Sequence, residues 1–328
     1  MRERPRPGRR VLAGALVLAA AGAVRPAAAQ EDVESLAARC GGSNVAMVAS
    51  CREAALALQA LQGGVGLLSA GGAQVAGSAS TLGKRFGGTP RFAPSLRAAL
   101  VRASVPDVRE AGAPLESESF IGLGLHGSLA LGLFDGFSIL PTVGGVLSLD
   151  VFGSAGVLFL PGGDGFREDP AYWGLGARVG IFRESFTMPG VTVSVARRSV
   201  GEVGLGDLSD GHAMEVLADG TVLSVRGTVG KDLLALGVLA GAGWDRYASE
   251  GSLAIRTGTG SASTTTFEEF ESDRLLFFGG VSVNFLVLQL SVEGGWAQGF
   301  GAPEGRGGGG YDPSSGALFL SAAARLTL

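Results

Sequence analysis

The chain has 328 residues, of which 17% are charged and 46% are apolar, and 56 are glycine. Disordered chains are poor in apolar residues and rich in charge, so this composition excludes a largely disordered protein. No apolar run after residue 30 reaches the roughly 18 residues that a membrane-spanning helix needs, so any insertion into a membrane would be by strands.

The first 29 residues have the order of charge and hydropathy that is typical of a secretory signal. Five arginines lie between residues 2 and 10, an apolar stretch covers residues 11–24, and three alanines occupy residues 27–29. We expect cleavage after Ala29; the alternative is a basic arm followed by a buried helix. Cleavage removes six Arg and one Glu and leaves 20 basic and 29 acidic residues, a formal charge of −9. An acidic mature chain argues against nucleic acid as a partner, because phosphate binding needs clustered Lys and Arg.

Residues 30–68 contain the two cysteines of the chain, Cys40 and Cys51. The flanking residues suit two helices, with Gly41 and Gly42 as the break and Asn44 as the N-cap of the second. An even cysteine count in an exported chain predicts a disulfide, and we expect a stapled helical hairpin in the periplasm or acting as a plug. The alternative is a pair of free thiols with a redox role.

From residue 91 to residue 328, apolar residues alternate with small or polar ones in ten runs, separated by breaks that alternate between short and long. This predicts an all-β fold, an antiparallel up-and-down transmembrane barrel of about 10 strands (8 to 12). Residues 69–90 are either a linker or an extra strand. We place the longest connections at residues 201–220 and 248–273, and a short turn at residues 230–232.

The alternation separates two faces within each run, because successive strand side chains point to opposite sides. In the run from Phe120, Ile121 and Leu123 share the apolar face, whereas Gly122 and His126 share the other. The tryptophans fall on apolar faces near the long breaks, as in an interfacial aromatic belt: Trp173, Trp244 and Trp296. A soluble sandwich would also alternate, but its polar face would carry more Lys, Glu and Thr than this one.

The closing stretch of residues 316–328 places Leu318, Leu320, Leu326 and Leu328 on one apolar face. With the signal ending at residues 27–29 and the strand alternation, it makes the chain resemble bacterial outer-membrane β-barrel proteins. The resemblance implies a Gram-negative outer membrane, with its lipid and the barrel assembly machinery as partners. It also implies a final strand read as a tag, which usually ends in Phe where this chain has Leu328.

Parity predicts a lumen lined by charged residues of both signs: Arg178, Arg198, Arg226, Arg325, Asp150, Asp245, Glu293 and His126. Buried charges need partners, so we expect ion pairing; the alternative is a lining that selects a cargo. Inward glycines leave room for a narrow, partly apolar cavity. A hairpin in or beneath it would be similar in architecture to plugged lipid-uptake barrels such as the long-chain fatty-acid transporters.

An enzyme is the remaining class to weigh. His212 lies near Asp207 and Asp210, and such a pair can activate water; the arrangement is similar to the omptin proteases, which also need an opposing acidic pair, here only Asp164 and Asp169. His126, Ser128 and Asp150 could form a hydrolase-like triad inside the barrel, although a lumen histidine in a structural role is the alternative. No phosphate loop, zinc spacing or calcium loop occurs, so we expect neither cofactor nor metal.

These patterns predict passive transport or binding of small molecules, including apolar ones. The alternatives are a structural or adhesive barrel that acts through its long loops, and third an outer-membrane hydrolase.

Overall fold

The computed structural model describes residues 32–84, 88–109, 116–138, 145–186, 188–256, 261–301 and 310–328. Two helices precede the strands, α1 (Val33–Gly41) and α2 (Val45–Ala70). The strands are β1 (Phe92–Pro106), β2 (Ser117–Phe134), β3 (Ser148–Phe159), β4 (Phe166–Arg167), β5 (Ala171–Phe182), β6 (Gly190–Leu205), β7 (Met214–Leu233), β8 (Leu236–Arg256), β9 (Ala262–Phe285), β10 (Leu288–Ala297) and β11 (Ala317–Leu326). A short 3-10 helix, Gly162–Asp164, precedes β4.

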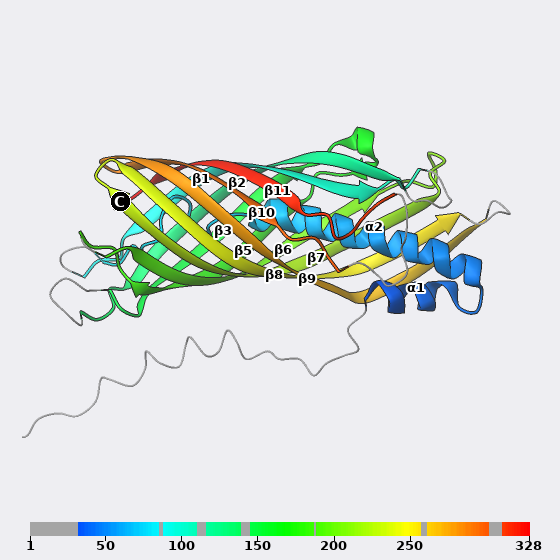
Figure 1. Ribbon diagram of the computed structural model, residues 1–328, viewed down its shortest axis with the longest axis horizontal. Coiled ribbons are helices and arrows are strands. Elements are labelled where there is room, and N and C mark those ends of the chain that lie inside the picture. Colours follow the sequence, from blue (N-terminus) through cyan, green and yellow to red (C-terminus); the bar gives the residue numbers. More distant parts are fainter. Residues whose placement is uncertain are drawn as a thin grey trace, which may run out of the picture.

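The strands form one closed barrel (Figure 1). Apart from β4, each strand pairs antiparallel with the strands before and after it in the chain, and β1 pairs with β11, with Ser95 opposite Arg325 and Arg102 opposite Leu318. The two-residue β4 pairs only with β6, so ten strands make the ring. The predicted antiparallel barrel of about ten strands is therefore confirmed, and the sandwich alternative is wrong because a single sheet closes on itself.

The two faces of each strand separate as their parity predicts. On β11, Leu318 and Leu320 are exposed on the outer surface, whereas Phe319 and Ser321 are buried. On β2, Ile121 is exposed, and the alternate residues point into the barrel. Closure satisfies the backbone of every strand within the sheet, which a barrel with an apolar outer surface needs in lipid. Among the described residues, no helix is both long and apolar enough to cross a membrane.

The loop lengths expected from the sequence are wrong at two of the long connections. Residues 201–220 and 248–273 are mostly strand, because β6, β7, β8 and β9 run on to Leu205, from Met214, to Arg256 and from Ala262. The turn expected at residues 230–232 lies instead at residues 234–235, where Leu234 takes a left-handed conformation (φ 59°). Turns in this conformation usually contain glycine, but neither residue of this turn is a glycine. The sequence therefore gives no indication of where the turn lies.

The N-terminal hairpin forms as the sequence predicts. Asp32 caps α1 by accepting a hydrogen bond from the backbone N–H of Ser35 at 2.8 Å. The side chain of Asn44 caps α2 by accepting from the N–H groups of Ala46 and Met47. Cys40 and Cys51 form a disulfide with their Cα atoms 5.9 Å apart, so the free-thiol alternative is wrong.

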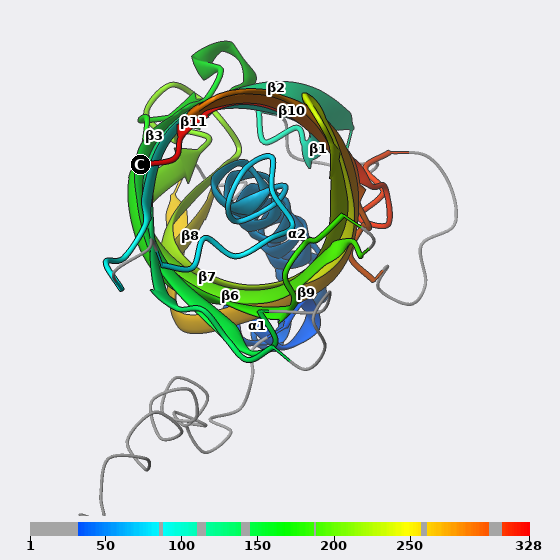
Figure 2. The same ribbon diagram turned by 90° about the vertical axis from the view of Figure 1, so that its left-hand side faces the viewer.

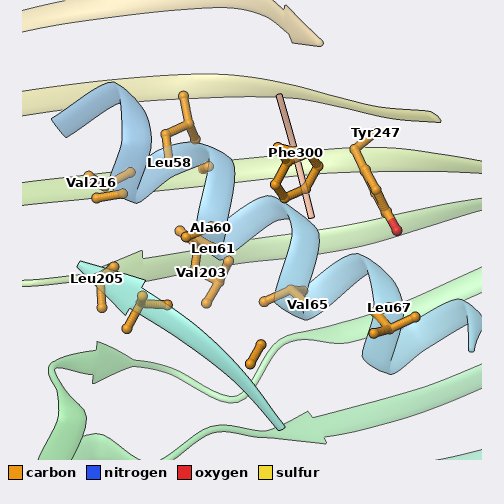
Figure 3. Close-up of a cluster of buried hydrophobic side chains, with 14 of the residues drawn as sticks. Leu58, Ala60, Leu61, Val65, Leu67, Val203, Leu205, Val216, Tyr247 and Phe300 are labelled. Atoms are coloured by element: carbon orange, nitrogen blue, oxygen red, sulfur yellow. The ribbon is translucent and has the colours of Figure 1, made fainter. Parts of the chain in front are cut away.

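Helix α2 runs inside the barrel (Figure 2), and its residues from Ala54 to Ala70 are all buried. It continues past three glycines because aromatic rings of the surrounding chain lie against each of them. An added Cβ at Gly63, Gly64 or Gly66 would lie 2.4 Å from a ring atom of Phe300, 2.6 Å from Phe120 or 2.2 Å from Tyr247. Figure 3 shows the apolar side chains of α2 among those of the wall, with Tyr247 and Phe300 alongside.

Residues 71–83 form no strand, and Lys84 makes only an isolated bridge with Pro90. They continue from the C-terminal end of α2 to the opposite end of the barrel, where the backbone N–H of Lys84 bonds to Asp135 beside the end of β2. At the other end, Arg39 of α1 donates to the carbonyl of Thr266 in β9. The chain thus enters at the end with the connections β1–β2, β6–β7 and β8–β9, and passes through the lumen before β1 begins.

Candidate functional site

The lumen is the candidate site, and it contains a plug, which we define as residues 54–84. Two buried ion pairs of the wall hold it. Arg178 pairs with Asp150 at 2.8 Å, and the same carboxylate accepts from the backbone N–H of Leu82 in the plug at 2.9 Å. Arg226 pairs with Asp245 at 2.7 Å and also donates to the carbonyl of Ala70 at 3.0 Å. Each pair is thus completed by a backbone group of the plug, which satisfies charges that are buried in the barrel.

Glu293 on β10 is buried and holds the plug without an ion pair in the described chain. Its two carboxylate oxygens accept from the backbone N–H groups of Ala73 at 2.9 Å and Gly77 at 2.8 Å. Gly77 has a positive φ of 70°, a conformation that favours glycine, and an added Cβ would lie 2.9 Å from the Cβ of Ser291. The close approach of this backbone to the wall therefore depends on the missing side chain.

Three other inward arginines, Arg97, Arg198 and Arg274, bond to uncharged groups of the plug and wall. Arg198 donates to Gln74 of the plug and to Ser224. Arg325 is buried, and its Nε and one terminal nitrogen have no hydrogen-bond partner. Arg97 and Arg274 also contact the plug, donating to the carbonyls of Gly71 and Gly63. Sequence reasoning missed these last two, although each shares the inward parity of its strand.

His126 lies in the lumen, 5% exposed, with its Nδ1 2.6 Å from the hydroxyl of Tyr172. The hydrolase-like triad of His126, Ser128 and Asp150 that the sequence suggested is not formed. The hydroxyl of Ser128 lies 2.6 Å from that of Ser95, and Asp150 belongs to the pair with Arg178. A cavity of about 20 Å³ adjoins His126 between the plug and the wall.

His212 lies in the connection between β6 and β7, where its Nδ1 accepts from the backbone N–H of Asp207 at 2.9 Å. The Asp207 carboxylate accepts from Ser209, which lowers the pKa of Asp207, and its other oxygen lies 3.5 Å from Arg167. Asp210 is exposed, and Asp169 accepts from the N–H of Leu160. These hydrogen bonds and the ion pair stabilise the conformation of the loops. None of them places a carboxylate against the His212 ring. The side chain of Asp164 lies outside the described residues.

Within the described ranges, no three His, Cys, Asp or Glu side chains are grouped so as to hold a metal ion.

No protein-family model matches the chain, and no curated protein matches it. Solved structures similar to it include the translocator domain of the autotransporter NalP from Neisseria meningitidis, with 12% identity, 72% of this chain and 88% of that chain covered, and a TM-score of 0.39. Another is the outer membrane protease OmpT from Escherichia coli, with 9% identity, 76% and 100% covered, and a TM-score of 0.38. A third is the toluene transporter TodX from Pseudomonas putida, with 9% identity, 73% and 89% covered, and a TM-score of 0.30.

The class of this protein follows from its own architecture. Its ten-stranded antiparallel ring is closed, its outer surface exposes leucine, valine and aromatic side chains, and its interior combines buried charged side chains with an apolar contact to α2. These properties together are those of barrels that span the bacterial outer membrane. The chain is a β-barrel protein of the bacterial outer-membrane type, with its own N-terminal helix inside the lumen.

Proposed function

We propose that this protein is a closed outer-membrane barrel that displays its N-terminal hairpin and a long β-ribbon on the cell surface. Export would use residues 1–29 as a cleaved signal, and insertion would involve the barrel assembly machinery and outer-membrane lipid. The role is that of a surface platform for binding, rather than of an open pore or an enzyme.

The observation that carries the proposal is the occupied lumen. Residues 54–70 of α2 are all buried inside the ring, and residues 71–83 continue through it with carboxylates and arginines bound to their backbone. A small barrel is filled by few side chains, so an added helix leaves little space for solute. Two cavities between the plug and the wall have volumes of about 30 and 20 Å³, each near the size of one or two water molecules.

The β-ribbon is the part of β7, β8 and β9 that extends beyond the length needed to cross a membrane. β7, β8 and β9 have 20, 21 and 24 residues, whereas a spanning strand needs about 9 to 11. Their surplus lies at the end that also holds α1, because Arg39 bonds to Thr266 near the start of β9. The ribbon and the hairpin therefore form one joined surface outside the membrane.

Solute flux tests the closed lumen directly. Proteoliposomes with the full-length mature protein should not swell in an osmotically matched sugar solution. A variant that lacks residues 31–68 should conduct, because it loses the helix that fills the lumen. The matched control is Asp273→Asn, which changes an exposed carboxylate on the outer surface and should leave the liposomes tight.

A gated transporter of small apolar molecules is the second candidate, and one observation favours it. In the stretch of residues 54–70, only Gln62, Gly63 and Ala70 form hydrogen bonds with the wall that the structure describes. Apolar side chains form much of the remaining contact, some of which are drawn in Figure 3, and apolar surfaces can slide past one another without unpaired polar groups. Flux of a small apolar dye through the full-length protein would support this candidate and contradict the closed barrel.

A further inference from the structure

The lumen carries more positive than negative charge. The fully buried charged side chains of the described chain are five arginines and three carboxylates: Arg178, Arg198, Arg226, Arg274, Arg325, Asp150, Asp245 and Glu293. Arg97 adds a sixth, half-buried guanidinium that donates to the plug. Two carboxylates are engaged by Arg178 and Arg226, and Glu293 accepts from backbone N–H groups. Positive charge in the lumen is therefore left without a counter-charge, although buried charges are stable only when compensated.

Two of the uncompensated arginines, Arg97 and Arg198, line the same cavity of about 20 Å³. The other residues that line this cavity are Gln74 and Ala76 of the plug, His126, Tyr172 and three serines, and none of them is a carboxylate. Neither arginine forms an ion pair with a carboxylate in the part of the chain that the structure describes. The cavity thus lies between two positive charges and offers hydroxyl, amide and guanidinium donors.

Three of the lining side chains have a buried nitrogen without a hydrogen-bond partner: Gln74 Nε2, His126 Nε2 and Arg198 Nε. Each of these side chains is more than nine-tenths buried. Nδ1 of His126 lies 2.6 Å from the Tyr172 hydroxyl, and in the tautomer in which that hydroxyl donates, the hydrogen of the neutral ring is on Nε2. All three unpartnered atoms are then donors, and buried donors without an acceptor are costly.

We propose that this cavity binds one halide-sized anion, with chloride as the natural occupant, held by Arg97 and Arg198 and by the donors of Gln74 and His126. A volume of about 20 Å³ has room for one small ion. A water molecule would fill the space but would leave the two guanidinium charges uncompensated. Because Gln74 belongs to the plug and the arginines to β1 and β6, the anion fastens the plug to two distant strands of the wall.

Bromide tests the site, because it resembles chloride in size and scatters anomalously. Crystals of the full-length mature protein grown in sodium bromide should show an anomalous peak between Arg97, Arg198 and Gln74. In detergent solution at fixed ionic strength, with fluoride as the balancing anion, the unfolding temperature should rise with bromide and then saturate. Arg198→Gln should increase the half-saturating bromide concentration by about tenfold or more, the factor expected for one charge-assisted hydrogen bond.

Two further variants serve as controls, one for misfolding of the barrel and one for general effects of salt on stability. Gln74→Leu changes the plug rather than the barrel wall, so the barrel should assemble while the bromide response weakens. Arg274→Gln removes another lumen arginine, one that bonds to Tyr247 and Gly63 away from the cavity, and should keep the response. A water-sized peak without anomalous signal overturns the proposal, and so does an equal bromide response in wild type, Arg198→Gln and Gln74→Leu.

Discussion

Glu293 shows at the residue scale how the lumen holds its plug. A buried carboxylate normally needs a cation, but this one accepts from two backbone N–H groups of the plug that lie four positions apart in the chain. Hydrogen bonds to a charged acceptor contribute more than those between neutral groups. The negative charge of Glu293 also offsets part of the excess positive charge of the lumen arginines. Both the hydrogen bonds and this charge compensation stabilise the plug inside the barrel.

Glu293→Gln should loosen the plug without opening the barrel. The amide keeps one acceptor oxygen and adds a donor that faces the N–H groups of Ala73 and Gly77, so we expect a loss of roughly 1–3 kcal/mol in plug attachment. Hydrogen exchange of the Ala73 and Gly77 amides in the full-length protein should accelerate by tenfold or more. Asp273→Asn on the outer surface is the control, and unchanged exchange in Glu293→Gln would show that this carboxylate does not hold the plug.

Asp32 gives α1 a pH-dependent cap. The hydrogen bond from the backbone N–H of Ser35 lowers the pKa of this carboxyl below its ordinary value. A folded-state pKa below the unfolded one means that the stabilisation is complete above about pH 4, and is lost as the pH falls through the folded-state value. The cap should therefore be fully effective at neutral pH.

Asp32→Ala should destabilise α1 by about 1 kcal/mol at pH 7 and by much less near pH 2, where the wild-type cap is protonated. NMR chemical shifts of the α1 amides report its helicity at each pH. Asp32→Asn is the matched control, because asparagine caps a helix but does not titrate, and its helicity should stay constant. Equal acid sensitivity in Asp32→Asn and wild type would assign the pH dependence to another group.

At the scale of elements, α2 is a helix whose glycines are explained by its surroundings. Glycine costs a helix about 1 kcal/mol relative to alanine, so three glycines between residues 63 and 66 would end an isolated helix. Here each glycine lets an aromatic ring approach the helix axis, and Tyr247 and Phe300 also place Arg274 over their faces, 5.2 Å from each ring centre. Packing therefore outweighs propensity in this part of the chain.

Gly66→Ala should weaken the plug although it raises helix propensity. The new methyl group would lie 2.2 Å from Tyr247 Cε1, and overpacking of this kind costs about 1–3 kcal/mol, more than the propensity gain. The amides of α2 should exchange faster and the unfolding temperature should fall. Gly227→Ala is the control, because the nearest atom to its added Cβ is 4.0 Å away; a Gly66→Ala protein that is more stable than wild type would contradict the packing account.

At the scale of the whole molecule, the path of the chain places its two ends on opposite sides. The helical hairpin lies at the end of the barrel with the β8–β9 connection, whereas β11 finishes at the other end, near the start of β1 (Figure 1). The plug joins these ends through the lumen, so α1 lies at the end of the barrel that also holds the long ribbon.

A short epitope tag before Asp32 should therefore be accessible from the same side as a tag in residues 257–260. A tag in the turn at residues 234–235 should be accessible only from the opposite side. Antibody binding to intact cells, and then to permeabilised cells, distinguishes the two sides. An N-terminal tag that behaves like the one at residues 234–235 would contradict this topology.

The sequence alone determined the barrel, because its signal is local. Inward and outward side chains alternate with a period of two, so the faces of β2 and β11, and the burial of Arg178 and Asp245, can be derived one strand at a time. The cap at Asn44 and the pairing of Cys40 with Cys51 are equally local. The true turn at Leu234 escaped prediction because no glycine or proline marks it, and the full lengths of β6 to β8 escaped because these strands run on through glycines such as Gly204, Gly220 and Gly251.

Only the tertiary structure decided what fills the lumen. The contacts that place the plug join residues far apart in the chain, such as Gly77 with Glu293 and Leu82 with Asp150, separated by 216 and 68 residues. No periodicity within a strand encodes such a contact. The end of the barrel at which α1 lies, the path of α2 past its glycines, and the cavity between Arg97 and Arg198 depend on the ring being closed around the helix, and so they emerge only when all ten strands are in place.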